Sequence, residues 1–83
     1  MIIKVRLFAM LRDKLPPDAV DGEFTMELPA GSPARHIIEK LDIPEAMAHL
    51  VMVNGYHLLP DERDNRPLVD GEVVSIFPPV AGG

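Results

Sequence analysis

Apolar and charged residues alternate strictly at the start of the chain, and this pattern limits the possible folds more than any other feature. Within residues 2–8 the two kinds of residue fall on opposite faces of an extended segment: Ile3, Val5 and Leu7 against Lys4 and Arg6. A period of two is typical of a strand with one buried face. A secretory signal would instead need a basic start and an unbroken apolar run. We therefore expect a first strand and a cytoplasmic protein.

The same alternation returns further along the chain. Phe24, Met26 and Leu28 are separated by polar residues, which predicts a second strand, paired with the first. Between the two strands, residues 9–15 contain helix formers and end at Pro16-Pro17, so a short helix or a single helical turn is expected there.

One longer helix is predicted after the second strand. Ser32 is the expected N-cap and Pro33 the first helical residue, where the missing proline N–H costs nothing. Apolar residues then repeat at helical spacing, and Pro44 limits the extension. The stripe consists of Ala34, Ile37, Ile38 and Leu41.

The second half of the chain reads as a hairpin followed by a final strand. Residues 50–53 and 56–59 flank Asn54-Gly55, a pair that tolerates the positive φ angles of a tight hairpin turn. Residues 60–67 are polar and bounded by prolines, which predicts an exposed loop. Asp70-Gly71 then turns the chain into a strand over residues 72–77.

The order of these elements predicts an α+β fold, in which one main helix packs across one face of a mixed sheet. A β-grasp arrangement, with the first and last strands adjacent and parallel, fits this order, although element order alone does not single it out. The 83 residues suffice for one domain, which we place at residues 1–77, with residues 78–83 as an extended, flexible C-terminal tail.

Composition excludes several classes of function. The chain has no cysteine, so it has no disulfide, thiolate metal site or cysteine nucleophile. A net charge of −5 disfavours nucleic acid as a partner. No apolar stretch approaches the roughly 20 residues of a membrane helix. The histidines lack the spacing of a helical metal pair, and the acidic residues 61–64 lack the rest of a calcium loop, so we expect no metal.

The tail consists of a proline pair followed by small residues: Pro78, Pro79, Val80, Ala81, Gly82 and Gly83. Prolines favour an extended path, and small side chains pass through a narrow cleft. A free carboxylate is a poor acyl electrophile, so we expect a partner to activate the carboxyl group of Gly83 and a sulfur nucleophile to replace the activating group. The product would be a terminal thiocarboxylate. The alternative is a frayed terminus without function.

Three segments resemble the small subunits of molybdopterin synthase, members of the ubiquitin-like sulfur carriers that end in Gly-Gly. They are the run from Val69 to Gly83, with its Phe-Pro-Pro-Val-Ala-Gly-Gly ending, the opening segment Val5 to Arg12, and Val53-Asn-Gly55. The resemblance implies a β-grasp fold and a sulfur-donating subunit without catalytic activity or bound cofactor.

The resemblance also implies two partners. A ubiquitin-activating-enzyme-like adenylyltransferase would use ATP to adenylate Gly83 before thiocarboxylation. The large, catalytic subunit of molybdopterin synthase would then receive the tail and make the dithiolene of molybdopterin, in a heterotetramer. Carriers for thiamine, cysteine or tungsten-cofactor synthesis remain open alternatives, as do a protein modifier joined to lysines and a binding module whose sheet alone matters.

Two phenylalanines mark the expected docking surface. Phe8 and Phe77 each end a predicted terminal strand, so they are expected to form an apolar patch at the root of the tail. We expect the partner to contact this patch, the sheet near Met52, and tail residues 78–81, while Gly82 and Gly83 carry the chemistry.

Overall fold

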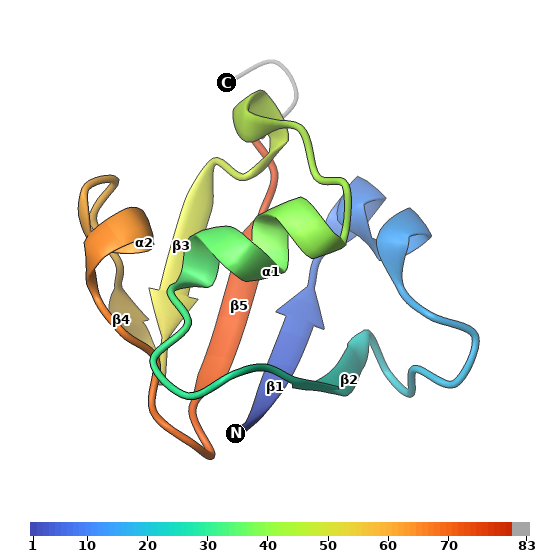
Figure 1. Ribbon diagram of the computed structural model, residues 1–83. Coiled ribbons are helices and arrows are strands. Elements are labelled where there is room, and N and C mark those ends of the chain that lie inside the picture. Colours follow the sequence, from blue (N-terminus) through green and yellow to red (C-terminus); the bar gives the residue numbers. More distant parts are fainter. Residues whose placement is uncertain (81–83) are drawn as a thin grey trace.

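The computed structural model describes residues 1–80, which form a single five-stranded mixed sheet with one main helix across one face (Figure 1). The strands lie in the order β2-β1-β5-β3-β4. Their bounds are β1 Ile2–Leu7, β2 Glu23–Glu27, β3 Leu50–Val53, β4 Tyr56–His57 and β5 Val73–Phe77. The α+β prediction is therefore confirmed.

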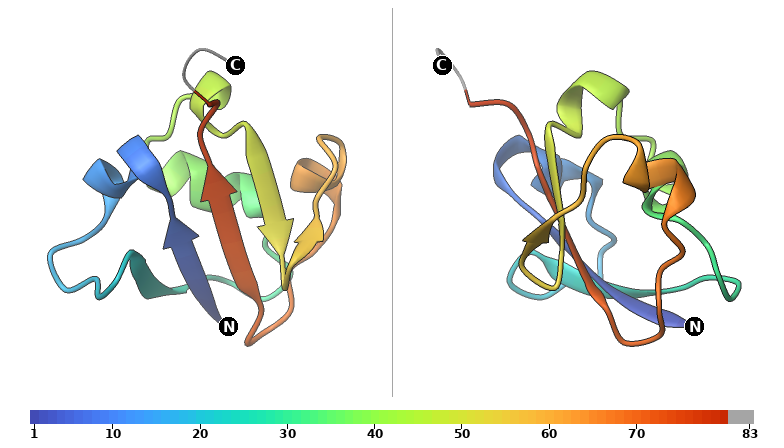
Figure 2. Two further views of the ribbon diagram at one scale, coloured as in Figure 1. Left: turned by 180° about the vertical axis from the view of Figure 1, so that it is seen from behind. Right: turned by 90° about the vertical axis from the view of Figure 1, so that its left-hand side faces the viewer.

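The first and last strands lie side by side at the centre of the sheet. β1 and β5 run parallel, with Leu7 opposite Ile76, while β2 and β3 pair antiparallel on either side. This pairing of terminal strands is the β-grasp arrangement that the resemblance implied. Because β1 and β5 run parallel, both end at the same edge of the sheet, from which the tail starts (Figure 2).

The core lies between the sheet and helix α1 (Ala34–Lys40) (Figure 2, right). The alternation in β1 places Ile3, Val5 and Leu7 in this core, as expected. Three positions of the predicted helical stripe, Ala34, Ile37 and Ile38, are also buried, and Leu41 packs against them. Full burial of one such side chain contributes about 1.5–3 kcal/mol to stability.

The predicted cap of α1 is wrong. The helix begins at Ala34, and Pro33, with φ −84° and ψ 166°, takes the extended N-cap position. The Ser32 hydroxyl instead donates to the carbonyl of Pro29 at 2.7 Å. Pro33 also forms an isolated bridge with Pro67, so tertiary pairing keeps it extended and moves the helix start one residue along.

The prediction of an exposed loop over residues 60–67 is wrong in part. The segment contains a short helix, α2 (Glu62–Asn65), and Arg63 is only 5% exposed. The Glu62 carboxylate accepts a hydrogen bond from the Leu59 amide at 2.9 Å, which closes the turn into this helix. The prolines and charged residues of this segment are typical of an exposed loop, so the sequence did not indicate a helical turn with one buried arginine.

The remaining connections include one tight turn and two 3₁₀ helices. Asn54 and Gly55 have φ values of 52° and 84°, which confirms the tight β3–β4 turn, although β4 is only two residues long. The expected helical turn after β1 is the 3₁₀ helix η1 (Ala9–Lys14), and a second 3₁₀ helix, η2 (Glu45–Met47), precedes β3. Among residues 1–80 no helix is long and apolar enough to span a membrane.

Candidate functional site

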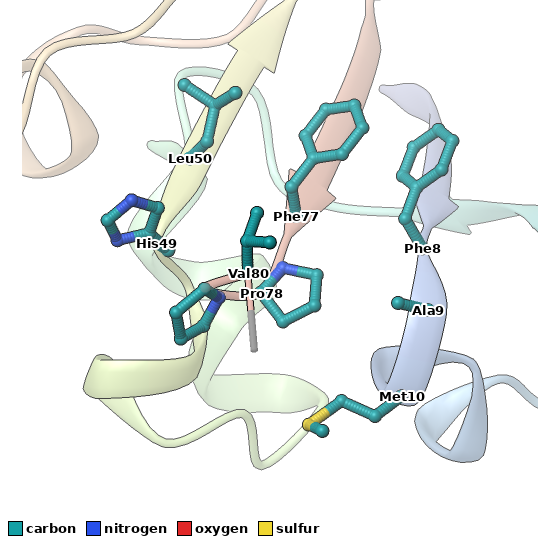
Figure 3. A pocket seen from close by; sticks show the side chains of 9 residues that line it. Phe8, Ala9, Met10, His49, Leu50, Phe77, Pro78 and Val80 are labelled. Atoms are coloured by element: carbon teal, nitrogen blue, oxygen red, sulfur yellow. The ribbon is translucent and has the colours of Figure 1, made fainter. Parts of the chain in front are cut away.

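Phe8 and Phe77 come together where the two central strands end. Phe8 directly follows β1, and Phe77 is the last residue of β5. Their rings stack, with centroids 4.1 Å apart and planes inclined by 13° (Figure 3). Such a pair adds about 0.5–1.5 kcal/mol beyond the area that it buries. The parallel register of β1 and β5 is the reason that two residues 69 positions apart meet.

An open groove with a volume of about 460 Å³ surrounds this pair, and we call it the tail-root groove. Three segments line it: the end of β1 and start of η1, the start of β3, and the chain that leaves β5 (Figure 3). Its residues are Phe8, Ala9, Met10, His49, Leu50, Phe77, Pro78, Pro79 and Val80. All except His49 have apolar side chains, so the groove is suited to an apolar surface.

His49 and Leu50 form a wall of the groove that the sequence did not reveal. The amide of His49 donates to the carbonyl of Phe77 at 3.0 Å. Leu50 is the register partner of Phe77 in the antiparallel β3–β5 pair. A hydrogen bond and a cross-strand pair therefore hold this wall against the end of β5. The sequence predicted a strand that starts at residue 50. Only the register of β3 against β5, however, shows that His49 and Leu50 lie beside Phe77.

Apolar side chains are exposed at this edge of the sheet. Met10 is 59% exposed and Val80 is 79% exposed, while Phe77 and Pro78 are half-buried. A cluster of exposed apolar residues on a small protein commonly marks a docking surface. Ala9, with a φ of 53°, makes the sharp turn that takes the chain from β1 into η1 beside the groove.

Met52 does not line the groove. It alternates with the buried residues Val51 and Val53, so it lies on the same outer face of the sheet as Leu50. Its cross-strand neighbours are Ser75 and His57. The expected contact of Met52 with a partner stays a prediction. It requires that the partner cover the outer face of β3 beyond Leu50.

The tail residues divide into two groups. Pro78, Pro79 and Val80 line the groove, which places three expected partner-binding residues beside Phe8 and Phe77. Ala81, Gly82 and Gly83 lie outside the described residues, so their expected roles stay predictions. The division into a domain of residues 1–77 and a tail of residues 78–83 also stays a prediction.

Two glutamates, Glu72 and Glu23, are held by arginine side chains. Two hydrogen bonds from Arg66, at 2.8 and 3.1 Å, and one from the Val69 amide hold the Glu72 carboxylate. These bonds, that from Arg66 above all, lower the pKa of Glu72 despite its burial. On the outer face, a hydrogen bond from Arg6 at 2.7 Å likewise lowers the pKa of Glu23. Both carboxylates therefore have structural partners within the described part of the chain.

The part of the chain that the structure describes holds no group of three or more potential metal ligands. The groove itself has one imidazole and otherwise hydrocarbon. This arrangement is suited to binding an apolar surface next to the point where the chain leaves β5.

Comparison with known proteins gives a family match over almost the whole chain. The profile described as the ThiS family matches residues 5–83. A putative molybdopterin converting factor subunit 1 from Pyrococcus furiosus is 31% identical, with 95% of this chain and 98% of that chain covered and a TM-score of 0.64. No curated protein matches the sequence significantly.

Two further solved structures share the fold. The HVO 2177 protein of Haloferax volcanii has a TM-score of 0.78 at 22% identity, covering 100% of this chain and 87% of that one. A chain from the complex of subunits 1 and 2 of molybdopterin-converting factor of Helicobacter pylori 26695 has a TM-score of 0.58 at 24% identity, and both chains are fully covered.

Proposed function

The chain belongs to the ThiS family of ubiquitin-like sulfur carriers, and on that premise we propose that it donates sulfur for molybdopterin synthesis from a thiocarboxylate at Gly83. The observation that carries the proposal is the tail-root groove, because it surrounds the point where the chain leaves β5 with exposed apolar side chains. The family match extends to residue 83, so it includes the diglycine.

The proposed chemistry proceeds in two steps on partner enzymes. A carboxylate oxygen of Gly83 attacks the α-phosphorus of ATP, and pyrophosphate leaves, which gives an acyl adenylate. A sulfur nucleophile, either sulfide or a persulfide, then attacks the acyl carbon, and AMP leaves. Sulfide gives the thiocarboxylate directly. A persulfide gives an acyl disulfide, whose S–S bond a thiol must then cleave. The chain provides the carboxyl group, and the activating enzyme, a ubiquitin-activating-enzyme-like adenylyltransferase, provides the ATP site.

The length of the tail matches this role. Six extended residues at about 3.3 Å each reach roughly 20 Å, which is enough to place a terminal carboxyl group inside a partner. An extended tail alone would lose much of its binding free energy to ordering. A preformed apolar groove at the tail root would offset that loss, since it adds contact area that needs little rearrangement.

The proposed recipient is the large subunit of molybdopterin synthase. The similarity to chains described as molybdopterin converting factor subunit 1, one of them in a complex with subunit 2, supports this choice. The small subunit would then be a sulfur donor, and the active site would belong to the large subunit. Formation of a heterotetramer is part of the same proposal.

Intact mass spectrometry tests the proposal. The full chain is incubated with an activating enzyme, ATP and a sulfur source, and omission of ATP is the control. We expect a mass increase that corresponds to replacing one oxygen by sulfur, located on the C-terminal peptide. A branched peptide at a lysine of another protein would favour the modifier function. An unchanged mass with every activating enzyme tested would favour the binding module.

Pathway assignment needs a second assay. The thiocarboxylated chain is mixed with the large subunit of molybdopterin synthase and its precursor, and with thiamine-, cysteine- and tungsten-cofactor-forming enzymes in parallel. Sulfur transfer in the molybdopterin reaction supports the proposal. Transfer only in another reaction would keep the carrier function and move it to that pathway.

A further inference from the structure

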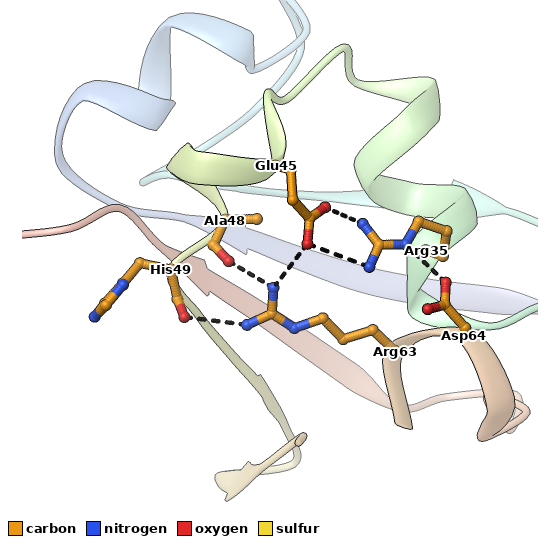
Figure 4. Close-up of polar contacts among 6 residues, drawn as sticks. All are labelled: Arg35, Glu45, Ala48, His49, Arg63 and Asp64. Carbon is orange, nitrogen blue, oxygen red and sulfur yellow. Dashed lines mark hydrogen bonds and ion pairs between the residues drawn. The ribbon is translucent and has the colours of Figure 1, made fainter. Parts of the chain in front are cut away.

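Arg63 is a buried charge that binds the backbone of His49, a residue that lines the tail-root groove (Figure 4). Its guanidinium donates to the carbonyl of Ala48 at 2.6 Å and to the carbonyl of His49 at 3.0 Å. The carboxylate of Glu45 lies 3.8 Å from the same guanidinium. Arg63 thus comes from α2, 14 residues after His49 in sequence, to hold the backbone just before β3.

These two carbonyls lie where η2 ends and the groove wall begins. Ala48 is the C-cap of η2, and carbonyls at a helix end need partners from outside the helix. Arg63 supplies them. His49 in turn holds the end of β5, because its amide donates to the carbonyl of Phe77. A continuous set of hydrogen bonds therefore runs from Arg63 through His49 to the residue from which the tail starts.

Burying the Arg63 side chain costs free energy, which indicates that this residue does more than fill space in the core. Its Nε is buried and has no hydrogen-bond partner among the described residues. A buried charge with an unpaired N–H destabilises the folded state relative to an apolar side chain of similar volume. Arg35 contrasts with it, because this residue pairs with Glu45 and Asp64 near the surface and donates no bond to the groove wall (Figure 4).

We propose that Arg63 is the positioning residue of the tail-root groove: by binding the carbonyls of Ala48 and His49, it fixes the His49–Leu50 wall and the carbonyl of Phe77 in the geometry that partners recognise. Recognition by partners rests on the proposed function, whereas the positioning itself does not. Arg63 touches no reacting atom, so it acts through His49.

Hydrogen exchange of the full-length protein tests the positioning without any partner. Arg63→Gln is compared with Arg63→Lys and with the control Arg35→Gln, which removes a charge from the same cluster. The reporters are the amide of His49 at the groove and the amide of Asn54, which donates to Val73 at the other end of β5 at 2.8 Å. In Arg63→Gln we expect at least about a tenfold loss of protection at His49, the lower end of the range for a hydrogen bond to a charged group.

Two features distinguish positioning from general destabilisation. The Asn54 amide should change no more in Arg63→Gln than in Arg35→Gln. Arg63→Lys should recover part of the His49 protection, because an ammonium group can reach one of the two carbonyls. Equal losses at His49 and Asn54, or full protection of His49, would overturn the proposal. If Arg63→Gln does not fold, the same comparison within Arg63→Lys decides.

Adenylation kinetics test the consequence for recognition. With an ATP-dependent activating enzyme, the KM for Arg63→Gln should rise by about fivefold or more while kcat stays within about twofold, since the reacting carboxyl group is unchanged. Arg35→Gln should match the wild type. A fall in kcat alone, or the same KM in both variants, would contradict the role of Arg63. A wild-type chain that no enzyme adenylates would count against the proposed function only.

Discussion

The two ends of β5 are held by different kinds of contact. At the start of the strand, backbone and carboxylate groups form a dense polar set: the Asn54 side chain accepts from the Val73 amide at 2.8 Å, and the Glu72 carbonyl accepts from the Lys4 amide at 3.0 Å. At its end, the His49 amide binds the Phe77 carbonyl, but the side chains are stacked aromatic rings and an open apolar groove. The same strand therefore has one end closed by internal partners and one end open to an external partner.

The two ends of β5 differ in how readily they can accept a partner. Polar groups at the start of β5 already have partners, so docking there would have to break existing hydrogen bonds. The open end exposes hydrocarbon, and covering it releases water without breaking such bonds. We therefore expect changes at the start of β5 to alter stability and changes at its end to alter function.

Removing Gly83 should have the largest effect. The deletion moves the carboxyl carbon by about 3.5 Å, and a misplacement of about 1 Å can already cost a hundredfold in a positioned reaction. Adenylation should therefore fall by at least about a hundredfold. The thermal midpoint should barely change, because the buried core ends at Ile76. Adding one residue after Gly83 should be equally damaging.

Turnover and melting curves of the three proteins check this prediction. Wild-type turnover in the deletion or in the extended chain, without prior trimming by a protease, would contradict the terminal-carboxylate mechanism.

Phe77→Asp should have the next largest effect, and Val73→Asp is its matched control. Both residues lie on the outer face of β5, at opposite ends, and both are half-buried. A charge in the groove should weaken binding of the large subunit by about tenfold to a hundredfold, as expected for an aromatic anchor. The same charge at Val73 should leave affinity close to wild type.

Calorimetric titration measures both affinities, and circular dichroism confirms that both variants fold. Equal weakening by Phe77→Asp and Val73→Asp would place the partner over the whole outer face and remove the distinction between the two ends.

Glu72→Gln, at the start of β5, should lower stability and leave partner binding unchanged. Its side chain is only 11% exposed and its carboxylate binds Arg66 and the Val69 amide, so neutralising it should reduce the free energy of unfolding by about 1–2 kcal/mol. Affinity for the large subunit should not change. Urea unfolding measures the loss, with Glu27→Gln at an exposed position as the control. A loss of affinity without a loss of stability would contradict a purely structural role for the start of β5.

The pH dependence of stability should show a smaller effect of the same group. The hydrogen bond from Arg66 lowers the folded pKa of Glu72, while its pKa in the unfolded chain keeps the ordinary value of a glutamate. Between the two values the unfolded state binds more protons, so stability falls as pH falls, and the contribution of Glu72 is lost below its folded pKa. The difference in unfolding free energy between wild type and Glu72→Gln should therefore shrink on acidification from neutral pH. A difference that stays constant would contradict the ion pair.

Local periodicity was sufficient to predict the strands and the main helix. The alternation in residues 3–7 and the stripe around Ile37 depend only on which face of an element is buried, and the Asn54-Gly55 turn depends only on φ preferences. The position of Phe8 beside Phe77 followed from the expected parallel pairing of the terminal strands. These features could be read from neighbouring residues or from the overall resemblance.

Features that depend on tertiary contacts could not be read in this way. Ser32 has the composition of a helix cap, but the bridge between Pro33 and Pro67 shifts the helix start. Arg63 lies among polar residues that are typical of a loop, and only its hydrogen bonds to the carbonyls of Ala48 and His49, which are distant in sequence, explain its burial. The His49–Leu50 wall depends on the register of β3 against β5.

Chemical-shift mapping of the isotope-labelled chain with the large subunit tests most directly whether the open end of β5 is the docking surface. The amides of Phe8, His49, Leu50, Phe77 and Val80 should shift or broaden on titration, because they belong to the tail-root groove. Those of Asn54, Glu72 and Val73 should stay in place at the other end of the strand. Shifts concentrated at these three residues or on α1, with the groove unchanged, would show that the partner docks elsewhere than at the open end of β5.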